Sequence, residues 1–173
     1  MKSTIGIEMN APPGLVFRLA RDVERWEHLL PHYARSRAVA RGSDGSLVAD
    51  FIARRPIVAL LGFNLPVAWR ARTWSEPAAR RLRFVHVAGA TKGMDVAWRI
   101  EPTATGTRVS IDHAFRSGLP GFATFVDRAF TRPIAGRTLA TFKALAEALA
   151  ETPVGTPSDG AQSVEHAAAY PAP

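Results

Sequence analysis

The chain has 173 residues, of which 47% are hydrophobic, and a formal net charge of +7. This size predicts one domain with a sizeable core, and no apolar run approaches the roughly 20 residues of a membrane span. The absence of Cys excludes disulfides and thiol nucleophiles. The basic charge lacks an accompanying nucleic-acid motif, so we expect no nucleic-acid partner. Without a signal-peptide pattern, we expect a cytoplasmic location.

The first elements are a strand and two short helices. Residues 4–9 alternate apolar and polar side chains, which is typical of a half-buried strand. Asn10 is the expected N-cap of a first helix that ends near Asp22. An apolar stripe then continues as far as Pro31, which predicts a second short helix set at an angle.

Residues 35–116 have the pattern of about six further strands separated by turns. Alternation places His86 on the same face as Leu82 and Phe84, and His113 on the same face as Val109 and Ile111. Both histidines are therefore expected to point inward. Because strands two apart lie about 10 Å from each other and a zinc bond is near 2 Å, we expect no shared metal site.

A long C-terminal helix follows Pro120, with a kink predicted near Arg132 because Pro133 and Gly136 lie inside its apolar pattern. From residue 151 onward the composition is typical of a flexible tail. The short connections favour an antiparallel α+β fold. A sheet curled around one helix, with aromatic and His side chains on its dry face, predicts a ligand pocket.

These features resemble the helix-grip superfamily, which includes START domains, and within it most closely the polyketide cyclase/dehydrase (aromatase/cyclase) group. The resemblance covers residues 3–150 and rests on five segments: Asn10–Phe17, Asp22–Trp26, Tyr33, Val67–Trp69 and the strand pair ending in Phe115. It implies a curled antiparallel sheet of about seven strands around the C-terminal helix. It also implies a START-like ligand-binding domain at 1–150 and a tail at 151–173.

The resemblance implies that three residues guide ring closure in the aromatase/cyclases: a Tyr, the acidic residue before it and an Arg on a central strand. Here Tyr33 is kept, His32 replaces the acid, and Thr73 stands at the Arg position. The candidate catalytic residues are Tyr33 and His32, and no cofactor is expected. The candidate ligand-binding residues are Trp26, Phe51, Trp69, Thr73, Phe84, His86, Trp98, His113, Phe115 and Phe130.

Two functions remain open at this point. One is a polyketide cyclase/dehydrase-like enzyme, and the other is a non-enzymatic carrier or sensor of a lipid or quinone, similar to coenzyme-Q-binding START-like proteins. The expected partner is a hydrophobic small molecule. The outward-facing arginines of the predicted sheet suggest a second partner, either an acidic carrier protein or an anionic membrane surface. The apolar segment 56–66, preceded by Arg54 and Arg55, is interpreted as a lid, a docking tip or strand ends. The sequence does not indicate an oligomeric state.

Overall fold

The computed structural model describes residues 1–58 and 63–152. These form one seven-stranded antiparallel sheet with the order β1-β7-β6-β5-β4-β3-β2. The predicted number of strands and the antiparallel α+β class are confirmed. The strands are β1 (Lys2–Met9), β2 (Tyr33–Arg41), β3 (Leu47–Val58), β4 (Phe63–Glu76), β5 (Arg81–Gly89), β6 (Asp95–Thr103) and β7 (Gly106–Ala114).

Short helices connect β1 to β2, and the long helix follows β7, as predicted. The first group is α1 (Pro13–Arg21), a 3-10 turn η1 (Val23–Arg25) and α2 (Trp26–Leu29), and a further 3-10 turn η3 (Pro77–Ala79) joins β4 to β5. The C-terminal group is α3 (Phe122–Val126), a π-helical turn η4 (Asp127–Thr131) and α4 (Arg132–Glu151). A kink was predicted near Arg132. The irregular turn of the helix is this π turn, which ends at Thr131, one residue before Arg132.

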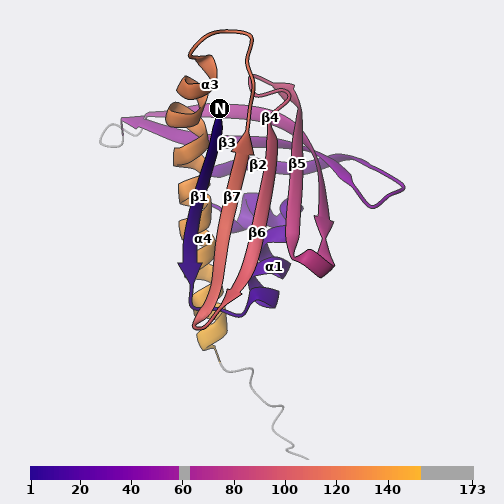
Figure 1. Ribbon diagram of the computed structural model, residues 1–173, viewed down its shortest axis with the longest axis vertical. Helices are drawn as coiled ribbons and strands as arrows, with labels where there is room; N and C mark the ends of the chain where they lie inside the picture. Colours follow the sequence, from indigo (N-terminus) through magenta and orange to yellow (C-terminus); the bar gives the residue numbers. More distant parts are fainter. Residues whose placement is uncertain (59–62, 153–173) are drawn as a thin grey trace, which may run out of the picture.

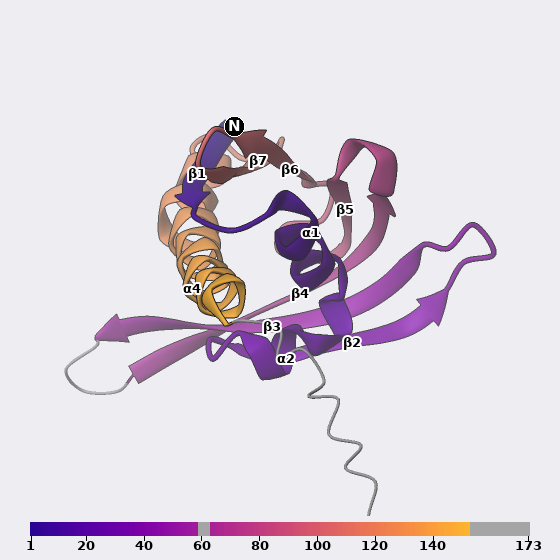
Figure 2. The same ribbon diagram turned by 90° about the horizontal axis from the view of Figure 1, so that it is seen from below.

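The sheet curls so that α4 runs alongside β1 and α1 lies within the curve (Figures 1 and 2). Two polar contacts join α4 to the end of β1. The Lys143 ammonium donates to the Glu8 carbonyl at 2.8 Å, and the Asn10 amide donates to the Glu147 carboxylate at 2.7 Å. Asn10 was predicted to be the N-cap of α1, and this prediction is wrong. Pro12, two residues later, occupies that position without a side-chain hydrogen bond.

The inner face of the sheet packs around the indole of Trp26. Its indole N–H donates to the Ala20 carbonyl at 3.1 Å. Aromatic rings from β2, β3, β5, β6 and α4 surround it, with centroids 5.5–5.9 Å away: Tyr33, Phe51, Phe84, Trp98 and Phe142. Trp26 therefore joins the short helices, the sheet and α4 into one core.

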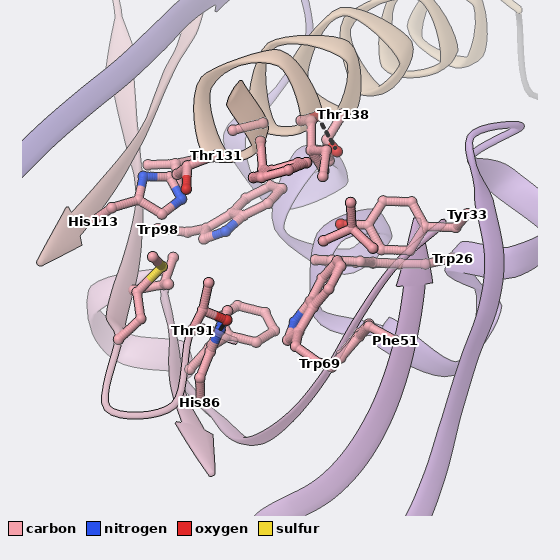
Figure 3. Close-up of a pocket in the computed structure, with 18 residues that line it drawn as sticks. Trp26, Tyr33, Phe51, Trp69, His86, Thr91, Trp98, His113, Thr131 and Thr138 are labelled. Atoms are coloured by element: carbon pink, nitrogen blue, oxygen red, sulfur yellow. Dashed lines mark hydrogen bonds between the residues drawn. The ribbon is translucent and has the colours of Figure 1, made fainter. Parts of the chain in front are cut away.

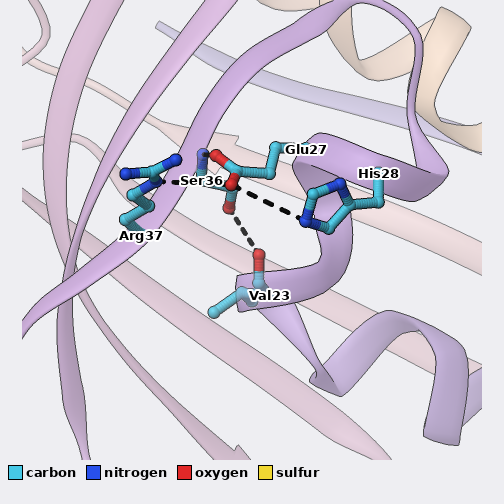
Figure 4. A network of polar contacts seen from close by, with 5 residues as sticks. All are labelled: Val23, Glu27, His28, Ser36 and Arg37. Atoms are coloured by element: carbon cyan, nitrogen blue, oxygen red, sulfur yellow. Dashed lines mark hydrogen bonds and ion pairs between the residues drawn. The ribbon is translucent and has the colours of Figure 1, made fainter.

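A polar network holds α2 against β2 (Figure 4). The Glu27 carboxylate accepts hydrogen bonds from the Ser36 amide at 3.1 Å and from Arg37 Nε at 3.3 Å. The Ser36 hydroxyl donates to the Val23 carbonyl. The hydrogen bond from the Ser36 amide holds the pKa of Glu27 below its usual value, so the network is intact at neutral pH. It fixes the turn that leads to Tyr33.

The outer face of the sheet carries the expected arginines, and most of them are paired with carboxylates. The described pairs are Arg70–Asp50, Arg72–Asp44, Arg83–Asp95, Arg99–Asp112 and Arg108–Glu8. Such exposed pairs contribute about 0–1 kcal/mol each. They offset much of the local positive charge, and an acidic partner on this face stays a prediction.

The apolar segment 56–66 belongs mostly to strands, since Pro56 pairs with Asn64 and Val58 with Phe63. Residues 59–62 lie outside the described part of the chain, so the lid and docking interpretations stay predictions. The tail from 153 onward lies outside it as well. Among the described helices, none is long and apolar enough to cross a membrane.

Candidate functional site

A cavity lies between the inner face of β4–β7 and the C-terminal helix (Figure 3). The space open to the centre of a water molecule is about 90 Å³. Since one water needs about 10–15 Å³ by this measure, the cavity has room for several waters. It is lined by Trp26, Tyr33, Phe51, Val67, Trp69, Phe84, His86, Thr91, Met94, Val96, Trp98, Ile111, His113, Phe130, Thr131, Ile134, Ala135 and Thr138.

The π turn supplies two neighbouring residues to this cavity. Phe130 and Thr131, at the end of η4, both line it. Ile134, Ala135 and Thr138 continue this face along α4. Pro133 lies in the first turn of α4, where a missing N–H is tolerated.

Tyr33 and Thr138 supply hydroxyl groups at one end of the cavity (Figure 3). Burial raises the pKa of Tyr33, and the Thr138 side chain partly opposes this rise. The phenol is therefore protonated at neutral pH and available as a hydrogen-bond donor.

His32 lies behind this end rather than in the cavity lining. Its Nε2 is 2.9 Å from the Thr138 hydroxyl, which itself donates to the Ile134 carbonyl at 2.9 Å. Because that donation uses the only hydroxyl proton, the Thr138 oxygen accepts from His32, and Nε2 carries the imidazole proton. Burial lowers the pKa of His32 to about 4, so the ring is neutral at pH 7.

His86 and Trp69 form one wall of the cavity. Their rings stack with centroids 5.8 Å apart, and His86 Nδ1 is 2.6 Å from the Thr91 hydroxyl. Burial lowers the pKa of His86 to about 3, with a smaller contribution from His113. The imidazole is therefore a neutral polar group beside an indole.

His113 is buried on β7, and its Nδ1 has no hydrogen-bond partner among the described residues. Burial lowers its pKa to about 4, although the charge of Asp127 acts in the opposite direction. Asp127 accepts from the Ser3 hydroxyl at 2.6 Å and from Arg132 Nε at 2.8 Å. Burial works against the Asp127 charge, but these hydrogen bonds outweigh it and hold its pKa below the usual value.

The entrance lies where the lining side chains are partly exposed. These belong to β4, β5, the following turn and the start of the C-terminal helix: Val67, Trp69, His86, Thr91, Phe130, Thr131 and Ile134. The opposite end is closed by buried residues, including Trp26 and Phe51. Among the described lining residues none is charged at neutral pH, because both lining histidines are neutral.

Nine of the predicted site residues line the cavity, and three do not. Thr73 is buried on β4, but it lines a separate pocket, together with Arg21 of α1 and Val23 of η1. Phe115 is buried beyond the end of β7, and its ring lies against Phe122 at 6.4 Å. His32 reaches Thr138 from behind.

The sequence interpretation missed the threonines of the lining. Thr131 and Thr138 are spaced by seven residues, the same distance as two helical turns, and this spacing could have indicated a shared face. Thr91 lies in the turn after β5, where no periodic pattern applies. The remaining missed residues are the apolar Val67, Met94, Val96, Ile111, Ile134 and Ala135.

Similar solved structures include two aromatase/cyclases. One is the di-domain aromatase/cyclase BexL from the BE-7585A biosynthetic pathway, with 26% identity and a TM-score of 0.67 over 88% of this chain. The chain spans about half of that protein, 48% of its length. The other is the ZhuI aromatase/cyclase from Streptomyces sp. R1128, with 18% identity and a TM-score of 0.72 over 90% of this chain and 99% of that one. The ZhuI likeness shows the fold alone.

A START superfamily protein from Mycobacterium smegmatis shares the fold, with 18% identity and a TM-score of 0.55 over 87% of this chain and 97% of that one. No curated protein matches the sequence. The sequence profile of a family described as "Polyketide cyclase / dehydrase and lipid transport" matches residues 2–147, which is most of the chain. The cavity and fold agree with this match, and the chain belongs to the polyketide cyclase/dehydrase and lipid transport family, which has a START-like, helix-grip fold.

Proposed function

We propose that the protein is a carrier or sensor of a hydrophobic, ring-bearing small molecule of polyketide-like or quinone-like character. The observation that carries this proposal is the cavity lining, where aromatic rings alternate with neutral polar groups. The rings offer stacking surfaces, and the Tyr33, His86 and His113 side chains offer hydrogen bonds to carbonyl or hydroxyl groups of a ligand. An uncharged lining favours a ligand whose buried part is also uncharged.

The cavity volume implies that binding is accompanied by rearrangement at the entrance. Ligand pockets usually enclose about 300–1,000 Å³, whereas the space open to water centres here is about 90 Å³. The partly exposed Trp69 and Phe130 are the large side chains at the entrance. We expect these two rings to move apart when a ligand enters.

Extraction of the purified protein into organic solvent, followed by mass spectrometry, tests this function. We expect one class of hydrophobic compound in a stoichiometric amount. In the Ala135→Leu variant three extra carbon atoms would occupy the cavity, so the compound should be lost. Ala140→Leu, on the exposed side of the same helix, is the control and should retain it. Equal amounts of compound in both variants would place the ligand elsewhere.

A second candidate function is dehydration without a cofactor. The side chains of His113 and Tyr33 favour this function. A base that removes an α-proton from a β-hydroxy ketone and an acid that protonates the departing hydroxyl together release water. Neutral His113 has an unpartnered Nδ1 that could accept the α-proton, and the Tyr33 phenol could protonate the leaving group. Turnover of a poly-ketone analogue that is lost in Tyr33→Phe would support this enzyme. Binding without turnover would support the carrier.

A further inference from the structure

Arg55 is an inward-facing arginine on β3, next to the entrance residue Phe130. On β3 the buried side chains Ala49, Phe51 and Ala53 alternate with more exposed ones, and Arg55 continues the inward series. Its guanidinium carbon lies 5.9 Å from the ring centroid of Phe130, which lines the cavity. Arg55 is therefore separated from the cavity by a single aromatic ring.

The guanidinium of Arg55 is incompletely satisfied. Its Nε is buried and has no acceptor, and no carboxylate pairs with it among the described residues. Residues 59–62 are Ala-Leu-Leu-Gly and add no acidic side chain. Arg83 also has a buried Nε without an acceptor, but its Nη2 already donates to Asp95 at 3.2 Å. Arg55 thus differs from the paired arginines of the outer face.

We propose that Arg55 binds the carboxylate of an amphipathic ligand whose apolar body occupies the cavity. This inference rests on the proposed function and narrows its ligand to hydrophobic acids. A guanidinium presents parallel N–H groups that match the two oxygens of a carboxylate. The Phe130 ring holds the guanidinium by a cation–π contact. Since the described lining carries no charge, the acid group would remain at the entrance beside Arg55.

A competition assay with paired ligands tests this proposal. N-phenyl-1-naphthylamine, an uncharged fluorescent probe, reports occupancy of the cavity, and decanoate or 1-decanol displaces it. The variants are Arg55→Met, which keeps much of the apolar stem, and Arg54→Met, which removes the same charge from the exposed neighbouring residue. We expect Arg55→Met to weaken the binding of decanoate about tenfold, or by about 1.4 kcal/mol, and to leave the binding of 1-decanol unchanged. Arg54→Met should change neither ligand.

The unfolding temperature provides a second readout. Because Arg55→Met removes a buried N–H without an acceptor, we expect an unchanged or higher unfolding temperature. If both variants weaken decanoate binding equally, the proposal is overturned, and general charge attraction explains the effect. If Arg55→Met weakens the binding of decanoate and of 1-decanol equally, the proposal is also overturned, and lost packing explains the effect. If the probe binds none of the proteins, the proposed function fails together with this inference.

Discussion

Replacement of Thr138 by Val tests the hydrogen-bond arrangement behind the cavity. Val has nearly the same shape but lacks the oxygen that accepts from His32 Nε2 at 2.9 Å. His32 is only 3% exposed, so its N–H would be left buried without an acceptor. Such a group costs about 1–3 kcal/mol of stability. At 2–4 °C per kcal/mol for a chain of this size, the unfolding temperature should fall by roughly 2–12 °C.

Urea and thermal unfolding at pH 7.5, followed by circular dichroism, measure this effect. Thr141→Val is a matched control, because Thr141 donates to the Arg137 carbonyl at 3.0 Å but contacts no histidine. We expect the control to stay within about 0.5 kcal/mol of the native protein. In a double variant with His32→Phe, where both polar partners are gone, the loss should be smaller than the sum of the single losses. Equal stability of Thr138→Val and Thr141→Val would refute the proposed hydrogen bond.

Three further predictions concern the core and the buried histidines. Gly106→Ala should destabilise the protein, because a Cβ there would clash with the Met9 carbonyl oxygen. Gly136→Ala should stabilise it by about 0.5–1 kcal/mol, since the space around that helical position is open, and equal unfolding temperatures of the two variants would contradict this. Trp26→Ala should cost about 3–5 kcal/mol in urea unfolding, and a cost below 1 kcal/mol would show that its ring contacts are not central. The folded-state pKa of His86 is about 3 against 6.5 ordinarily, so the unfolded chain binds more protons and stability is lost as the pH falls from about 6.5 toward 3. His86→Gln should therefore flatten the dependence of unfolding temperature on pH below 6.5, and an unchanged slope would contradict the neutral buried ring.

Strand periodicity predicted much of the fold and part of the site. The structure has the predicted alternation that places His113 inward on β7. A shift of the strand by one residue would turn its buried side chains to the outer face, so the alternation is strongly determined. The π turn at Asp127–Thr131 could not be predicted, since its longer hydrogen-bond register leaves no distinct pattern in the sequence. Thr73 faces inward as predicted, but it lines a separate pocket beside α1 and η1, because the cavity that it reaches depends on packing between distant segments.

Arg55 illustrates a pattern that was present in the sequence but was interpreted differently. Alternation from Phe51 through Ala53 places it inward, whereas we grouped it with Arg54 as a flank of a docking tip. His32 illustrates the opposite case. The His32 and Tyr33 rings lie edge to face with centroids 5.0 Å apart, yet only Tyr33 lines the cavity, and His32 contacts Thr138 behind it.

Binding of N-phenyl-1-naphthylamine to the native protein and to Ala135→Leu tests the ligand-binding cavity most directly. Three tryptophans, Trp26, Trp69 and Trp98, line the cavity, so energy transfer from tryptophan reports a probe bound there. We predict one saturable site per chain with strong quenching of tryptophan fluorescence, and its loss in Ala135→Leu but not in Ala140→Leu. Absence of binding, or equal binding by both variants, would contradict a ligand site between the sheet and the C-terminal helix.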